Sequence, residues 1–316
     1  MKIAFVTHCF PAVTETFIID QVADLLERKV EVDVYAFEKG DEEHVSSRYR
    51  EHCMDERTRY FQVPKSRWRR LISAPRLALR LLWFQPLTFL RAFNIFKHFK
   101  RALSLELLYK IQPLVFEDYN LVHCHFGPAA VSFLELRDVL GWHVPLVTSL
   151  YGYDVSTVPR TQRSDYYQRL QSEGALFFVM SENMKRRAVA LGFPEEKVVV
   201  HPVSIDVEAY PFCARTRKDG EPVQIVAVGR LTEKKGFDDL IRALAVVRSQ
   251  TGEDFRCSII GGGPLEPELR RLVIQLRLSE IVSFEGWMSV QCVVNTMLRK
   301  HFMVAPSKTA ADGDME

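Results

Sequence analysis

The sequence has little of what marks a secreted or membrane-spanning protein. Its six cysteines form no Cys-x-x-Cys pair and no zinc-binding spacing, which favours reduced thiols in a cytosolic protein over a disulfide framework. No uncharged run reaches the roughly 18 residues of a transmembrane helix. The apolar run after Lys2 is too short for a signal peptide. These absences favour a globular cytoplasmic protein.

Two further absences bear on function. No Gly-x-Gly-x-x-Gly follows the first predicted strand, Ile3 to Val6, which argues against a dinucleotide-dependent oxidoreductase. The formal net charge is only +2 and says little about partners by itself. The chain does have 316 residues, of which 47% are hydrophobic and 26% charged, enough for two globular domains.

The first half of the chain predicts a doubly wound parallel sheet. The strand Ile3 to Val6 is followed by a helix with apolar positions from Phe17 to Leu26 and by an alternating strand from Val30 to Phe37. Strand, helix and strand in this order form a βαβ unit, which places the fold in the α/β class.

Two later strands should end at one edge of this sheet. The run from Leu121 ends at His125, and the run from Pro145 leads into Tyr151-Gly152-Tyr153-Asp154. Because binding groups gather at the carboxyl ends of parallel strands, these two loops are expected to share a crevice. A histidine at a strand end is more often a buried structural residue than a ligand, so both interpretations of His125 stay open.

Residues 64–110 carry an unusual charge distribution. Eleven lysines and arginines, from Lys65 to Lys110, stand against the single acid Glu106, which gives 11 − 1 = +10 over 47 residues. Aromatic and leucine residues are interleaved with them at helical spacing, and Pro75 and Pro86 interrupt the run. The pattern favours helices lying on an anionic membrane over a hairpin with a solvated basic face. No nucleic-acid-reading motif is present, so we expect no nucleic acid partner.

The second half centres on residues 224–244, QIVAVGRLTEKKGFDDLIRAL. A buried strand ends at Gly229, and a charged loop delivers Arg230 and Lys235 to the start of a helix. Free N–H groups at a helix N-terminus and two cations make a binding site for an anion such as phosphate. The alternative is an ordinary strand, loop and helix whose cations are solvated.

A second βαβαβ set follows. Its strands are expected to end at Gly261-Gly262-Gly263, at Gly286-Trp287-Met288 and at Pro306-Ser307. The predicted organisation is a first domain of residues 1–207 with the basic insert at about 64–110, a linker of residues 208–222, and a second domain of residues 223–316.

The loop Gly229-Arg230-Leu231, with Lys235-Gly236 after it, resembles the donor-phosphate loop of retaining glycosyltransferases of family four, the group 1 enzymes of exopolysaccharide or colanic-acid type. The resemblance implies a GT-B fold, in which two Rossmann-like, doubly wound parallel-sheet domains face a cleft, here with the second domain incomplete. It gives Arg230 and Lys235 the donor diphosphate. It adds further donor contacts at Gly229, Gly261, Gly262, Trp287, Met288 and Ser307.

The resemblance also extends to the first domain and to the end of the chain. Pro11 to Phe17 is similar to the family's acceptor-side loop, which assigns Glu15 and Thr16 to that side, together with His125. The family's His-Gly-x-Asp loop is represented by Tyr151, Gly152 and Asp154, and the tyrosine leaves the role of that histidine open. The run up to Glu316 resembles the approach to the first of two family glutamates, so Glu316, Tyr151 and Asp154 are the catalytic candidates and the chain is expected to be a C-terminally truncated one.

The resemblance therefore predicts a retaining glycosyltransferase of hexosyltransferase type. Its substrates would be a nucleotide diphosphate sugar and a lipid-linked or polysaccharide acceptor at the inner face of the cell membrane, in cell-surface polysaccharide biosynthesis. No cofactor and no metal are predicted, because Arg230 and Lys235 would neutralise the leaving diphosphate. No metal-binding motif of the Asp-x-Asp type is expected either. The alternatives are a catalytically inactive remnant that binds a membrane or an acceptor, and a GT-B sugar-nucleotide epimerase.

Overall fold

The computed structural model of the protein describes residues 1–12, 14–42, 45–94, 101, 103–205 and 207–314. It divides the chain into two units, Met1–Ser204 and Ile205–Glu316. The first unit thus ends three residues before the predicted position 207. The predicted linker, residues 208–222, belongs to the second unit, and two of its arginines contact that unit. Arg215 Nη1 donates to the Lys300 carbonyl at 2.7 Å, and Arg217 Nη1 lies 2.8 Å from Glu253 Oε2.

The first unit contains a seven-stranded sheet in the order β3-β2-β1-β4-β5-β6-β7, and all neighbouring strands are parallel. The strands are β1 (Lys2–Phe10), β2 (Glu31–Lys39), β3 (Thr58–Tyr60), β4 (Leu121–His125), β5 (Leu146–Leu150), β6 (Leu176–Val179) and β7 (Val198–Val200). The sequence did not predict β3, because three residues are too few for a periodic pattern.

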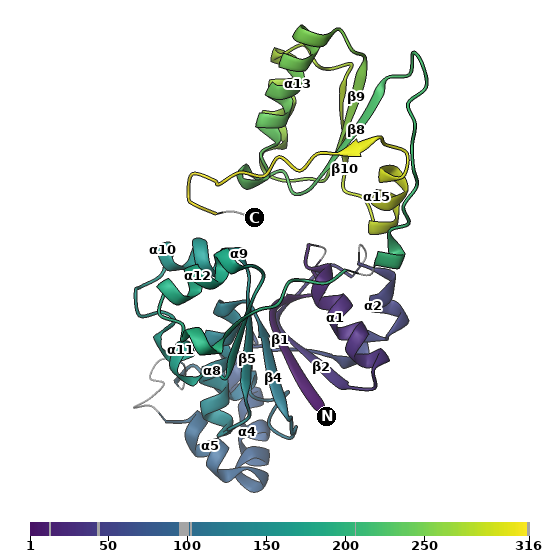
Figure 1. Ribbon diagram of the computed structural model, residues 1–316. Helices are drawn as coiled ribbons and strands as arrows, with labels where there is room; N and C mark the ends of the chain where they lie inside the picture. Colours follow the sequence, from purple (N-terminus) through teal and green to yellow (C-terminus); the bar gives the residue numbers. More distant parts are fainter. Residues whose placement is uncertain (13, 43–44, 95–100, 102, 206, 315–316) are drawn as a thin grey trace. The chain divides into compact units, whose positions relative to one another are not determined.

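Helices cover both faces of this sheet (Figure 1). They are α1 (Thr16–Glu27), α2 (Ser47–Glu51), α3 (Met54–Arg57), α4 (Arg67–Phe84), α5 (Pro86–Ala92), α7 (Glu106–Lys110), α8 (Gly127–Leu140), α9 (Gly152–Ser156), α10 (Val158–Thr161), α11 (Gln168–Glu173) and α12 (Glu182–Ala190), with short 3₁₀ turns at Glu195–Lys197 and, past the unit boundary, Val207–Ala209.

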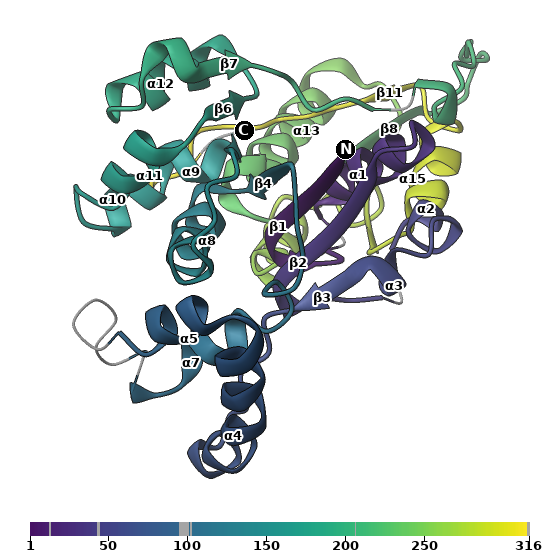
Figure 2. The ribbon, with the colours of Figure 1, turned by 90° about the horizontal axis from the view of Figure 1, so that it is seen from below.

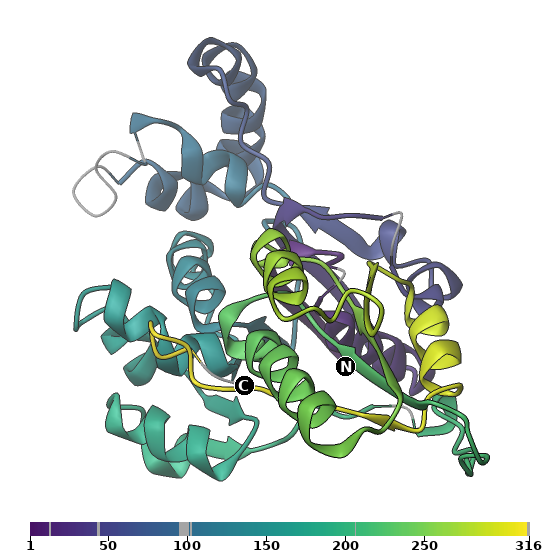
Figure 3. The same ribbon diagram turned by 90° about the horizontal axis from the view of Figure 1, so that it is seen from above.

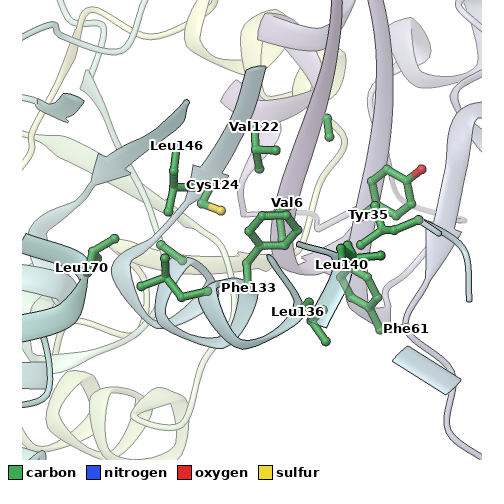
Figure 4. Close-up of a cluster of buried hydrophobic side chains, with 14 of the residues drawn as sticks. Val6, Tyr35, Phe61, Val122, Cys124, Phe133, Leu136, Leu140, Leu146 and Leu170 are labelled. Atoms are coloured by element: carbon green, nitrogen blue, oxygen red, sulfur yellow. The ribbon is translucent and has the colours of Figure 1, made fainter. Parts of the chain in front are cut away.

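Alternate residues of β1 enter two separate cores, as a strand buried on both faces requires. Ile3 and Phe5 pack with the buried side of α1, whereas Ala4 and Val6 pack with α8. Figure 4 shows Phe133 of α8 beside Val6, within the larger of these two cores. The continuous apolar run at the start of the chain therefore forms the central strand that the sequence predicts.

The second unit contains a four-stranded parallel sheet in the order β10-β9-β8-β11. Its strands are β8 (Val223–Val228), β9 (Phe255–Ile260), β10 (Val282–Gly286) and β11 (Phe302–Met303), and its helices are α13 (Phe237–Thr251), α14 (Glu266–Gln275) and α15 (Val290–Met297), with a 3₁₀ turn at Glu233–Lys235. Helices α13 and α14 lie side by side and bury Leu240, Leu244 and Leu269 against β8 and β9 (Figure 3).

Both sheets confirm the predicted α/β fold with two Rossmann-like parallel sheets. Within the described ranges, no helix combines the length and the apolar composition needed to cross a bilayer. All six cysteines are free thiols, with Cys124 and Cys257 buried in the strands where the sequence places them.

Candidate active site

In the first unit, the strand register brings the carboxyl ends of β4 and β5 to nearly the same level. His125 pairs with Ser149, so the residues that follow these two strands emerge side by side, and β1 runs along β4 and continues to Phe10. Parallel strands present their binding loops at this edge. Glu15 before α1, His125 at the end of β4, Tyr151 after β5 and Asp154 in the first turn of α9 are referred to as the first-unit cluster.

Asp154 ties two of these loops together. Its Oδ1 accepts a hydrogen bond from the Gly127 N–H at 2.9 Å, and its Oδ2 accepts one from the Tyr151 N–H at 2.6 Å. The carboxyl group caps α9 and has no exposed surface. Burial raises the pKa of Asp154 to about 7, against the opposing effect of these two hydrogen bonds. Asp154 therefore links the segment after β4 to the segment after β5 through its two hydrogen bonds.

Tyr151 occupies the position where the family pattern has histidine. Its hydroxyl lies 2.9 Å from His125 Nδ1, and its ring packs between Phe17 and Phe126, at centroid distances of 4.8 and 4.6 Å. Burial raises the pKa of the Tyr151 phenol, so the side chain is a neutral hydrogen-bonding group. The sequence places Phe17 on the apolar face of the first helix, but nothing in the local pattern indicates that Phe17 and Phe126 converge on one ring.

His125 is fully buried, so in this structure it supports Tyr151 and has no surface to offer an acceptor. The histidine ring stacks on His123 at a centroid distance of 4.5 Å, and His123 Nε2 lies 2.8 Å from Ser149 Oγ. Burial lowers the pKa of His123 to about 4 and the pKa of His125 well below its ordinary value, so both rings are neutral. The sequence left open whether His125 is a buried structural residue or a ligand. In this structure it is buried and makes its contacts within the protein.

Glu15 and Thr16 lie at the start of α1. Glu15 is the residue before the first turn and is half-buried. Burial is the main cause of the raised pKa of Tyr151 and of Asp154, and the negative charge of Glu15 is a smaller cause that acts in the same direction on both. The structure thus brings together His125, Tyr151 and Asp154, whose two loops the sequence placed at one edge of the sheet.

In the second unit, glycines allow the ends of neighbouring strands to approach closely. A Cβ on Gly261, whose φ is +129°, would lie 2.0 Å from the Gly229 carbonyl oxygen. A Cβ on Gly262 would lie 2.4 Å from Trp287 Nε1. The Gly261 N–H donates to the Gly286 carbonyl at 2.8 Å. The chain segments at the ends of β8 and β9 therefore meet backbone against backbone at Gly229 and Gly261, where only glycine fits, and Gly262 leaves room for the Trp287 ring.

The two predicted phosphate ligands lie beside these glycines. Arg230 is exposed, and the Cδ atom of Lys235 lies 3.4 Å from where a Gly229 Cβ would be. Lys235 ends the 3₁₀ turn, and Gly236, at φ +65°, is the residue just before α13. Gly229, Arg230, Lys235, Gly261 and Gly262, the second-unit cluster, thus combine two cations, a helix N-terminus and backbone open to close approach.

The other donor-side candidates are spread along the same edge. Trp287 is 56% exposed, whereas the Met288 sulfur faces Thr296 of α15 at 4.0 Å. Ser307 is exposed and follows Pro306, whose carbonyl oxygen lies where a Gly236 Cβ would clash. Trp287 and Ser307 thus have surface available for a ligand, and Met288 has less.

The last described segment folds back onto the loop that carries Lys235. The Lys308 N–H donates to the Lys234 carbonyl at 2.8 Å, and the Ala311 N–H donates to Glu233 Oε1 at 2.9 Å. Asp312-Gly313-Asp314 is an Asp-x-Asp motif, a pattern that can bind a divalent metal, so the expectation that the sequence lacks such a motif is wrong. Asp314, however, lies 3.1 Å from Lys234 Nζ, and the described residues contain no cluster of three or more metal-ligating side chains. Glu316 lies outside the described residues.

Two protein-family models match the chain. The model described as Glycosyltransferase Family 4 covers residues 14–209, and the model described as Glycosyl transferases group 1 covers residues 213–313. The chain belongs to this glycosyltransferase family. The family resemblance carried by the Gly229–Gly236 loop is therefore confirmed.

Curated relatives match over the whole chain. WcaL of Salmonella typhimurium, named for a role as a glycosyltransferase of colanic acid biosynthesis, is 30% identical over 327 residues, which cover 100% of this chain and 78% of WcaL. AmsK of Erwinia amylovora, named an amylovoran biosynthesis glycosyltransferase, is 29% identical over 100% of this chain and 78% of its own length.

Solved structures of glycosyltransferases share the fold. HepE from Anabaena, crystallised with UDP and glucose, superposes with a TM-score of 0.62 at 17% identity and covers 99% of this chain and 76% of HepE. Sucrose-phosphate synthase from Thermosynechococcus elongatus superposes with a TM-score of 0.58 at 16% identity. The match covers 97% of this chain and 75% of the synthase. This glycosyltransferase thus has the GT-B fold.

Proposed function

We propose that this glycosyltransferase transfers a hexose from a nucleotide diphosphate sugar, with retention, to a lipid-linked or polysaccharide acceptor in exopolysaccharide biosynthesis. The names of the relatives WcaL and AmsK support the exopolysaccharide role. HepE, which was crystallised with UDP and glucose, supports a nucleotide sugar as the donor. The reaction would take place in the cytoplasm, where nucleotide sugars and reduced thiols are both found.

The observation that carries the proposal is the second-unit cluster. Gly229, Gly261 and Gly262 let the backbone at the ends of β8 and β9 approach closely, and the start of α13 adds the positive end of a helix dipole. Arg230 and Lys235 provide charge-assisted donors next to this backbone. This combination fits a diphosphate better than it fits a neutral ligand.

In the proposed mechanism, the second-unit cluster stabilises the departing nucleoside diphosphate. Negative charge grows on the phosphate oxygen as the glycosidic bond breaks, and donors fixed beside it stabilise that charge more than the ground state. Trp287 and Ser307 would contact the nucleotide and the phosphates at the same edge. Glu316 would lie by the transferred sugar, as the resemblance implies.

The first-unit cluster would hold the acceptor side. Glu15 and Thr16 are half-buried at the start of α1, and Tyr151, which is 8% exposed and hydrogen-bonded to His125, would present its remaining surface to a sugar hydroxyl. Asp154 is buried and bonded to two backbone N–H groups, so its proposed part in catalysis is to position this loop.

The donor site is tested by titrating UDP and GDP onto the full chain by calorimetry. Arg230→Ala should weaken nucleotide binding by about 10- to 150-fold, because a hydrogen bond to a charged group contributes about 1.5–3 kcal/mol. Arg271→Ala, which removes an exposed arginine from α14, is the matched control and should bind as the wild type does.

Binding should be equal in Mg²⁺ and in EDTA, because the two cations supply the neutralising charge. Loss of binding in EDTA, and a further loss in Asp312→Asn, would instead assign the diphosphate to a metal. If the wild-type chain binds neither nucleotide, the inactive-remnant alternative is favoured. Conversion of the free sugar nucleotide without an acceptor would identify an epimerase.

A further inference from the structure

The basic insert presents a helix that is apolar on two opposite faces. Helix α4 packs against the first unit through Ala74, Leu77 and Leu81, which are at most 9% exposed. With α5 and α7 it forms a helical group at the side of the sheet (Figure 2). This buried face already accounts for the packing of α4 onto the protein.

The opposite face of α4 carries a second apolar row. Trp68, Ile72, Leu79 and Trp83 are 76%, 78%, 66% and 83% exposed. At about 100° per residue these four side chains, the apolar stripe, project within about 60° of one another and roughly opposite Leu77. Leu71 and Leu82, also exposed, widen the stripe on one side. Water-facing helix positions normally carry polar residues, so a stripe of this kind marks a surface that contacts something apolar.

Arginines border the other side of the stripe. Arg69, Arg76 and Arg80 are exposed and follow it at about 80–120° in the same projection. The guanidinium carbon of Arg80 lies 4.3 Å from the centre of the Phe116 ring, so this side chain is held against Phe116. The stripe begins and ends with tryptophan, a residue whose ring suits the boundary between hydrocarbon and water. A strip of apolar and aromatic side chains beside a row of cations matches the surface of an anionic bilayer.

We propose that α4 docks this glycosyltransferase on an anionic membrane, with the apolar stripe among the acyl chains and the arginine row at the lipid phosphates. A second copy of the chain fits this surface less well, because a two-fold contact through the stripe would bring two arginine rows together. A nucleic acid would match the arginines but would leave the apolar stripe in water. The proposal concerns binding alone and does not rest on the proposed transfer reaction.

Vesicle co-sedimentation of the full chain, without nucleotide, tests the proposal. The wild type should bind vesicles of phosphatidylcholine with about one third phosphatidylglycerol, and should bind pure phosphatidylcholine vesicles at least tenfold more weakly. The variant with Trp68, Ile72, Leu79 and Trp83 each replaced by Gln should lose roughly 100-fold or more in partitioning, because its apolar area no longer leaves water. Arg69→Gln with Arg76→Gln should lose about fivefold for each charge removed.

A matched variant replaces Phe212, Val246 and Ile274 with Gln, three exposed apolar residues elsewhere on the chain, and should bind as the wild type does. Both sets of substitutions lie on the solvent side, so thermal melts should coincide and exclude misfolding. Tryptophan emission should shift to the blue with anionic vesicles, and Trp68→Phe with Trp83→Phe should remove this shift while co-sedimentation persists.

Equal vesicle binding by the wild type and the apolar-stripe variant would overturn the proposal. So would a wild-type chain that ignores both kinds of vesicle. If light scattering instead shows a dimer that the apolar-stripe variant converts to monomer, without vesicle binding, the occupant of this face is a second copy. None of these results depends on whether the donor site binds nucleotide, so the two proposals fail independently.

Discussion

At the scale of single residues, burial decides what the side chains of the first-unit cluster can do. His125 and Tyr151 are hydrogen-bonded partners, and the histidine has no exposed surface. Asp154 is a buried cap on α9 that joins two loops. The sequence predicts that these residues share one edge, which holds. It could not tell which of them face water, because that depends on Phe17 and Phe126 closing over Tyr151.

Asp154 should give the protein a specific pH dependence. Its pKa is raised from 3.8 to about 7 in the folded state, so folding retains a proton that the unfolded chain releases. The contribution to stability is fully present below pH 3.8 and is lost as the pH rises to about 7, by up to about 4 kcal/mol. Urea unfolding of the wild type and Asp154→Asn between pH 4 and 8 measures this difference. A wild type that gains stability over the variant as pH rises would show that the two N–H bonds outweigh burial.

At the scale of elements, glycines set how closely the strand ends of the second unit approach. The contact of Gly261 with the Gly229 carbonyl depends on a positive φ and on the missing Cβ. The sequence identified Gly229, Gly261 and Gly262 as turn residues, and a triple glycine by itself is often no more than a turn. Only the pairing of β8 with β9 shows that the turns at Gly229 and Gly261 touch.

Gly261→Ala should therefore destabilise the second unit by roughly 2–5 kcal/mol, since both the backbone angle and the carbonyl contact oppose a Cβ. Gly220→Ala is a matched control, because Gly220 also has a positive φ, +76°, but a Cβ there meets nothing within 4 Å. It should cost only about 1 kcal/mol. Denaturant unfolding followed by the fluorescence of the four tryptophans compares the two variants, and equal losses would mean that the close contact at Gly261 has no energetic weight.

At the scale of the whole molecule, the chain consists of two units, each with its own hydrophobic cores. The first unit ends at Ser204, and Ile205 begins the second. The apolar residues of β8, β9, α13 and α14 form a cluster distinct from the two clusters on either face of β1. Separate cores allow separate unfolding.

We expect two transitions on heating. Gly261→Ala should lower only the transition temperature of the second unit. Asp154→Asn should alter only the transition of the first unit. Scanning calorimetry, with hydrogen exchange to assign each transition to residues 1–204 or 205–316, makes this measurement. A single transition that both variants shift together would show that the units unfold as one.

The sequence by itself determined the fold class, the family and the loop from Gly229 to Gly236. These properties depend on residues that are close together in the sequence. They are the period of apolar residues, the glycines at strand ends, and the spacing of Arg230 and Lys235. Tertiary structure decided that His125 is buried and that α4 carries a second apolar face beyond the one it packs. Burial is set by contacts between residues far apart in the chain, so a single segment does not reveal which of its apolar faces is covered.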